Sequence, residues 1–77
     1  MTRGMFVTVL GRKAKIDQTK YDGTTAFTDV DKGEYYAPYV QWANKYDIVN
    51  GMTATTFDPS GEISREQMAA ILYRYAK

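Results

Sequence analysis

The sequence predicts an all-α fold: a small helical bundle built from helix-loop-helix repeats with long ordered loops. Two observations lead to this prediction. Apolar residues recur at the three- and four-residue spacing of a core-facing helix in three stretches, at about residues 3–15, 36–46 and 65–76. The first and last of these stretches also resemble each other, which is typical of a repeat protein whose units bury their apolar faces together.

The last helix, predicted over residues 65–76, carries the clearest local signals. Ser64 stands as its N-cap with Gln67 three residues on, which is the spacing of a capping box. A turn rich in Asp, Pro and Gly precedes it at residues 58–61. Its core-facing residues are expected to be Met68, Ile71, Leu72 and Tyr75.

The first helix, predicted over residues 3–15 with Thr2 as its N-cap, is similar to the last one. When Ser64 is aligned with Thr2, the identical positions of the first helix are Arg3, Leu10, Arg12, Ala14 and Lys15. Its expected apolar stripe consists of Phe6, Val9, Leu10 and Ala14. The basic residues near its end fit the helix dipole and need no ligand.

The middle helix is predicted over residues 36–46, with Pro38 tolerated in its first turn. Its expected apolar stripe consists of Tyr36, Tyr39, Val40 and Ala43. Trp42 lies beside this stripe, so either the core or a ligand could take it. Asn50 and Gly51 follow the helix and are expected to adopt positive φ angles for a sharp reversal.

Residues 27–30 alternate apolar and polar, and their Phe and Val are expected to fix this loop to the core. Asp29 and Asp31 raise the question of a calcium loop. The EF-hand pattern counted from Asp29 fails at its sixth and twelfth positions, which are Glu34 and Val40. Turn and cap chemistry is therefore the better interpretation of these carboxylates.

Composition limits the possible functions of this chain of 77 residues. It contains no Cys and no His, so we predict no enzyme, no metal site and no cofactor. The net charge of +1 does not favour nucleic acid. No apolar run approaches the ~20 residues of a membrane span, so no membrane insertion is expected. The N-terminus lacks the pattern of a signal peptide, so an export signal is not expected in this chain.

Several short motifs follow one another in a fixed order. They are Phe27-Thr28-Asp29-Val30, Tyr35-Tyr36, Trp42-Ala43, Ile48-Val49-Asn50-Gly51, Phe57-Asp58-Pro59 and Ile63-Ser64-Arg65-Glu66-Gln67. Together they closely resemble the S-layer homology (SLH) domain. By this resemblance, residues 1–15 are the closing helix of a preceding SLH repeat, residues 16–26 are a linker, and residues 27–77 are a complete repeat.

The resemblance implies a non-catalytic module that anchors exported proteins. SLH domains bind secondary cell-wall polymers, often carrying ketal-pyruvate, on Gram-positive-type cell walls. Family members usually use three repeats in a pseudo-threefold bundle with binding grooves between the units. The implied location is extracellular, in the cell wall or S-layer.

The resemblance also implies a binding site. The family motif Thr/Ser-Arg-Ala-Glu appears here as Ser64-Arg65-Glu66-Gln67 and as Thr2-Arg3-Gly4-Met5, which departs from the pattern at its third and fourth positions. An Arg in the first turn of a helix places a planar fork of donors beside free backbone N–H groups, which suits a sugar carboxylate. An aromatic ring could stack on the sugar, and a glycine allows its close approach. The expected ligand-binding residues are Arg65, Arg3, Trp42, Gly51, Asp29 and Ser64.

Structural alternatives remain open for two of these residues. Trp42 could belong to the core, and Arg65 could form an ion pair with a loop carboxylate such as Asp29. At the level of function, the first hypothesis is an anchor that binds cell-wall polysaccharide. The second is a self-association module, in which neighbouring repeats or a homo-oligomer cover an exposed apolar helix face.

Overall fold

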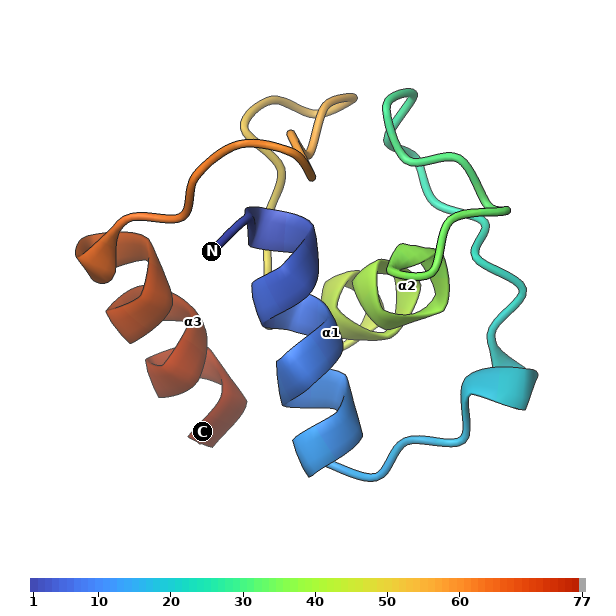
Figure 1. Cartoon of the computed structure of the whole chain (residues 1–77), viewed down its shortest axis with the longest axis horizontal. Coiled ribbons are helices and arrows are strands. Elements are labelled where there is room, and N and C mark those ends of the chain that lie inside the picture. The colour runs from blue at the N-terminus through green and yellow to red at the C-terminus, as the bar shows by residue number, and fades with distance from the viewer. Residues whose placement is uncertain (77) are drawn as a thin grey trace.

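The computed structural model describes residues 1–76, so Lys77, the last residue of the predicted repeat, lies outside the described residues. Its helices are α1 (Arg3–Lys13), the short 3-10 helix η1 (Gln18–Lys20), α2 (Ala37–Lys45) and α3 (Arg65–Ala76). Figure 1 shows α1 between α3 on one side and α2 on the other, with long loops closing the top. Helices are the regular elements of the described chain, which agrees with the predicted all-α class; assembly into a bundle of repeats stays a prediction.

The helix ends follow their local signals closely. Residues 65–76 form α3 as predicted, whereas α1 ends two residues before the predicted Lys15. Lys15 has a φ of 58° and therefore cannot continue the right-handed helix. The predicted cap of α1 is confirmed, because Thr2 Oγ1 accepts a hydrogen bond of 3.2 Å from the Met5 amide.

The core lies chiefly between α1 and α2. Its fully enclosed side chains include Val7, Val40, Val49 and Phe57. The predicted core residues Tyr39, Val40 and Ala43 of α2 are buried, and Tyr36 is partly buried against them. These contacts confirm the predicted stripe of α2.

The expected apolar stripe of α1 is wrong at Val9, which is 52% exposed. The buried side of α1 instead contains Gly4, Thr8 and Gly11. A β-carbon at Gly11 would overlap the Tyr39 ring, so glycine lets α1 approach α2 closely. This close approach turns the glycine face inward and leaves Val9 on the outside.

The position of α3 depends on its cap and on a few apolar contacts. The capping box is confirmed, because the Ser64 amide donates to Gln67 Oε1 at 2.9 Å and the Gln67 amide donates to Ser64 Oγ at 3.1 Å. Ile71 is buried, and Met68 and Tyr75 pack partly against the core. The prediction that Leu72 faces the core is wrong, since it is 47% exposed. Only a narrow side of α3 therefore meets the rest of the molecule.

The loop between α1 and α2 is held in place by hydrogen bonds to α2. Residues 16–26, the predicted linker, lie against α2: the Gly23 amide donates to Gln41 Oε1 at 2.8 Å, and the Tyr39 hydroxyl donates to Gln18 Oε1 at 3.0 Å. Gly23 has a φ of 89°, as expected for a glycine turn. None of the described helices is long and apolar enough to cross a membrane.

The predicted positive φ angles at Asn50 and Gly51 are wrong. The chain reverses after α2 at Asp47, whose φ is 61°, a conformation that Asp tolerates better than most residues. The amides of Ile48 and Val49 then both bond to the Ala43 carbonyl, which completes the end of α2.

Candidate functional site

Three of the predicted site motifs meet at the peptide groups of Phe57. The Asp29 carboxylate accepts hydrogen bonds from the amides of Phe57 and Asp58, at 2.9 and 2.7 Å. Arg3 Nε donates to the Phe57 carbonyl oxygen at 2.7 Å, and the guanidinium lies 4.7 Å from the centre of the Phe57 ring. We call Arg3, Asp29 and Phe57 the Phe57 cluster. It joins the start of α1 to two loops distant in sequence.

Arg3 is a buried cation with nearby counter-charges. Its side chain is 5% exposed. Burial lowers the pKa of Arg3, while the carboxylates of Asp58 and Asp29 act in the opposite direction and raise it. An arginine stays protonated in a protein, so Arg3 itself carries a permanent positive charge beside these carboxylates.

One terminal nitrogen of the Arg3 guanidinium is left without a partner among the described residues. Nε bonds to Phe57, and one terminal nitrogen donates to the Asn50 carbonyl at 3.4 Å; the other, Nη1, makes no hydrogen bond to the described residues. Within residues 1–76, no buried side-chain nitrogen or oxygen lacks a partner. Nη1 therefore reaches solvent.

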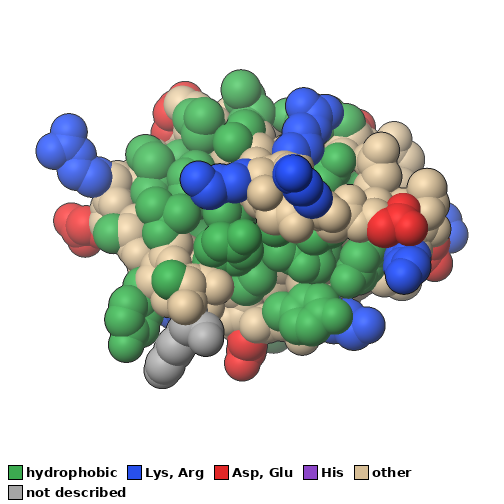
Figure 2. All heavy atoms as spheres, turned by 90° about the horizontal axis from the view of Figure 1, so that it is seen from below, with side chains coloured by type: hydrophobic (Ala, Val, Ile, Leu, Met, Phe, Trp, Pro, Cys, Tyr) green, Lys and Arg blue, Asp and Glu red, His purple; other side chains and the backbone are tan. Residues whose placement is uncertain are grey.

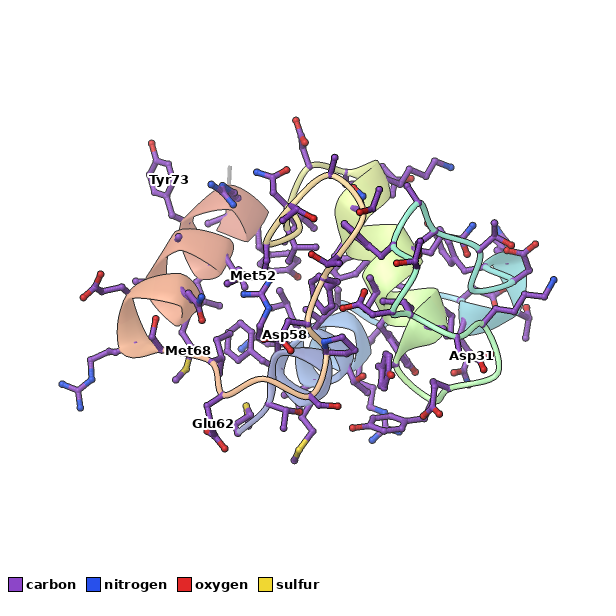
Figure 3. The ribbon with its side chains drawn as sticks, turned by 90° about the horizontal axis from the view of Figure 1, so that it is seen from above. Asp31, Met52, Asp58, Glu62, Met68 and Tyr73 are labelled. Atoms are coloured by element: carbon purple, nitrogen blue, oxygen red, sulfur yellow. The ribbon has the colours of Figure 1, made fainter. Side chains whose placement is uncertain are left out.

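Arg3 opens onto a cavity of about 250 Å³, which we call the Arg3 cavity. Its walls come from the start of α1, the loop after α2 and the inner side of α3, and its lining residues are Arg3, Val49, Asn50, Gly51, Met52, Gln67, Ala70, Ile71 and Arg74. Two of them are arginines and none is acidic. In Figure 3, Met52 lies between α3 and the loops, while Tyr73 points outward from the far side of α3.

The expectation that free backbone N–H groups lie beside Arg3 at the start of α1 is wrong. The amides of Arg3 and Gly4 donate to the carbonyls of Gly61 and Pro59, both at 2.9 Å. The start of α1 is thus occupied by the loop before α3. The donors that remain for a ligand at this end of α1 are those of the Arg3 side chain.

Gly51 lines the same cavity, but packing already explains its lack of a side chain. A β-carbon there would overlap the Phe27 ring and the carbonyl oxygens of Thr53 and Thr56. The glycine is therefore required by the loop itself, whether or not a ligand comes near it.

Ser64 and Arg65 lie outside the cavities, at the exposed start of α3. The Ser64 hydroxyl is used by the capping box. The suggested ion pair between Arg65 and Asp29 does not form; the ion pair found among the described residues joins the N-terminal amine to Glu62 at 3.1 Å. Arg65 remains available to solvent, but it does not meet Arg3 in one pocket.

Trp42 belongs mostly to the core, the alternative that the sequence left open. It is 7% exposed, and its ring centre lies 6.2 Å from that of Tyr75 in an edge-to-face contact. Its remaining surface lines a second, larger cleft at the lower end of the molecule. The predicted ligand-binding residues therefore lie in separate places. Arg3 and Gly51 line the Arg3 cavity, Ser64 and Arg65 lie at the exposed start of α3, and Trp42 borders this cleft.

Sequence reasoning missed Arg74, which lines both the Arg3 cavity and the larger cleft. A basic residue in the last turn of a helix fits the helix dipole without any ligand, so Arg74 does not stand out in the sequence. The spacing of Arg74 is the signal that could have revealed it. Gln67, Ile71 and Arg74 are four and three residues apart, so they share the inner side of α3. Among residues 1–76, no group of acidic or other ligating side chains is placed to hold a metal ion.

The helices and the Phe57 cluster define a small all-α domain whose loops are tied together by an arginine, a carboxylate and an aromatic ring. The model of the S-layer homology domain family matches residues 26–69, more than half of the chain. The chain belongs to the S-layer homology domain family. This match confirms the resemblance seen in the sequence. Domains of this family commonly anchor proteins to bacterial cell walls.

Two relatives show where such a segment occurs. An endoglucanase of Bacillus sp. (strain KSM-635) is 33% identical over 48 residues, which are 62% of this chain and 5% of the relative. An amylopullulanase of Thermoanaerobacterium thermosulfurigenes is 34% identical over 74 residues, 96% of this chain and 4% of the relative. The chain therefore spans a small fraction of both relatives, and their enzyme names describe those whole proteins. No solved structure matches the chain.

Proposed function

We propose that this chain is a non-catalytic cell-surface anchoring module that binds a secondary cell-wall polysaccharide through carboxylates such as pyruvate ketals. The observation that carries the proposal is the open edge of Arg3 in a cavity lined by two arginines and no acid. A ligand of this kind would place the chain on the outer surface of a bacterial cell, in the wall or S-layer of a Gram-positive-type organism.

The Arg3 cavity suits a carboxylate for electrostatic and geometric reasons. Arg3 is held rigidly by Phe57 and Asn50, so little side-chain entropy is lost when an anion binds to Nη1. Arg74 adds a second positive charge from α3. Gln67 Oε1 is used by the cap, which leaves the amide nitrogen of Gln67 as a further donor.

The other predicted residues take different parts in this proposal. Asp29 acts by positioning, since it fixes the backbone at Phe57 to which Arg3 bonds. Arg65 is an exposed cation at the start of α3, where the polymer could continue beyond the cavity. Ser64 supports that helix end through its cap.

Titration calorimetry against purified wall polymer, with and without its pyruvate, tests this function. We expect the wild-type chain to bind only the pyruvylated polymer. Arg74→Ala is expected to lower the affinity about tenfold or more because it removes one of the two cavity cations. Arg12→Ala, an exposed arginine of α1 outside the cavities, is the matched control and should bind like the wild type.

Arg65→Ala in the same titration shows whether the exposed helix start contributes. Equal binding of the two polymers, or equal affinities of Arg74→Ala and Arg12→Ala, would contradict the role of carboxylates at the Arg3 cavity. If the wild type binds neither polymer, the anchoring proposal fails for this chain.

A second candidate function, self-association, rests on a different surface. Met1, Met5 and Val9 follow one another about one turn apart at the start and on the outer side of α1, and they are 52%, 43% and 52% exposed. Exposed apolar side chains aligned in this way are typical of a surface that another protein covers. A neighbouring repeat or a second copy of this chain could supply that cover.

Sedimentation velocity at increasing micromolar concentrations tests self-association. If the exposed row of Met1, Met5 and Val9 is an interface, the wild type should form dimers or larger species, and the double variant Met5→Lys/Val9→Lys should remain monomeric. Tyr35→Lys, which changes an exposed side chain outside this row, is the control and should associate like the wild type, since Tyr35 is 55% exposed. A wild-type chain that is monomeric throughout would rule out self-association in this range.

A further inference from the structure

A second large hollow among the described residues lies at the lower end of the molecule, away from the Phe57 cluster. This open cleft, which we call the aromatic cleft, has a volume of about 630 Å³. It is formed by the segment after α1, the second half of α2 and the end of α3, and its lining residues are Ile16, Asp17, Lys20, Tyr21, Trp42, Lys45, Tyr46, Ile48, Arg74 and Tyr75. Figure 2 shows this end from below, with hydrophobic side chains across its middle and Lys and Arg side chains over and around them.

Aromatic rings form much of the wall of the cleft. Tyr46 is 57% exposed and Tyr21 is partly buried, so both offer surface to a ligand. The Lys45 ammonium lies 5.9 Å from the centre of the Tyr21 ring and 5.6 Å from that of Tyr46. A cation held between two rings is a combination that suits a ligand with both an apolar face and a negative charge.

The charges of the cleft favour an anion. Of the described residues that line the cleft, Lys20, Lys45 and Arg74 are cations and Asp17 is the one carboxylate. One oxygen of that carboxylate is used locally, because Asp17 Oδ1 accepts hydrogen bonds from the amide and the hydroxyl of Thr19, at 3.1 and 2.5 Å. These bonds lower the pKa of Asp17 and hold its charge in the turn before η1.

The aromatic cleft and the Arg3 cavity lie on either side of a shared lining residue, Arg74. Arg74 lines both, and a third hollow lined by Tyr46, Asp47, Asn50 and Arg74 shares residues with each of them. All three hollows therefore adjoin Arg74. A chain of several sugar residues that entered the Arg3 cavity could reach the aromatic cleft past Arg74.

We propose that the aromatic cleft is a second subsite, which stacks Tyr46 and Tyr21 on another carboxylate-bearing sugar residue of the polymer held in the Arg3 cavity. This inference rests on the proposed function and extends it, because it predicts that binding depends on the length of the saccharide. It also gives a role to residues 16–21, which precede the family match at residues 26–69.

Calorimetry with pyruvylated polymer fragments of one and of several repeating units tests the second subsite. The wild type should bind the longer fragment about tenfold more tightly than the single unit. Tyr46→Ala should lose most of that gain while keeping its affinity for the single unit. Tyr35→Ala is the matched control, because Tyr35 is 55% exposed but lies outside the cleft.

A second pair of variants separates the cleft from general charge effects. Lys20→Ala should weaken binding of the longer fragment severalfold, whereas Lys32→Ala, an exposed lysine outside the cleft, should not. If both fragments bind the wild type equally, and Tyr46→Ala behaves like Tyr35→Ala, the second subsite is wrong while the anchoring function stands. If no fragment binds the wild type, both proposals are overturned.

Discussion

Replacing Gly51 with alanine is expected to destabilise the protein by about 2–3 kcal/mol, enough to lower its Tm by about 10–20 °C. The new methyl group would overlap the Phe27 ring and the carbonyl oxygens of Thr53 and Thr56. A ring can turn slightly, but two backbone carbonyls move only if the loop changes its course. Thermal and urea unfolding followed by circular dichroism measure the loss.

Gly33→Ala is the matched control for this prediction. The nearest atom to a β-carbon at Gly33 would be Asp31 Oδ1 at 3.5 Å, an ordinary contact. The control should therefore stay within about 1 kcal/mol of the wild type, because alanine also restricts the unfolded chain. If Gly51→Ala were as stable as Gly33→Ala, the close packing of the loop around Gly51 would be refuted.

Replacing Arg3 with methionine is expected to cost about 2–4 kcal/mol, because it removes the buried donor of the Phe57 cluster. The Phe57 carbonyl would lose its 2.7 Å bond, and the nearby carboxylates of Asp29 and Asp58 would lose their interaction with a cation. Methionine retains much of the apolar stem of arginine, so the loss reports mainly on the guanidinium. Urea unfolding at neutral pH measures it.

Arg12→Met is the control, since Arg12 lies on the same helix but is exposed. Its stability should match that of the wild type within about 0.5 kcal/mol. A third variant, Arg3→Lys, separates folding from binding because it retains the charge. At a temperature at which it is fully folded, it should bind pyruvylated polymer more weakly, since one ammonium cannot replace the planar guanidinium that bonds to Phe57 and an anion together.

The sequence by itself determined the elements with local signals. The Thr2 cap, the capping box of Ser64 and Gln67 and the bounds of α3 were all predicted as they are found. Such features depend on neighbouring residues, whose hydrogen bonds close within one turn. The ordered motifs likewise indicated the S-layer homology family before any contact was known.

Only the tertiary structure decided which side of each helix is buried. Hydrophobic spacing favoured Val9 and Leu72, but both are exposed, because α1 turns its glycines toward α2 and α3 meets the body along a narrow side. Glycine gives no apolar signal in a periodic pattern, yet it permits the closest approach of two helices.

The tertiary structure also decided how the predicted site residues are grouped. Arg3 and Arg65 occupy equivalent places in their motifs, but Arg3 is buried against Phe57 and Arg65 is exposed. Their environments differ because the loop before α3 covers the start of α1, through the bonds of Gly61 and Pro59 to the first amides of that helix. A contact between residues so distant in sequence depends on the path of the whole chain, and a local motif cannot specify it.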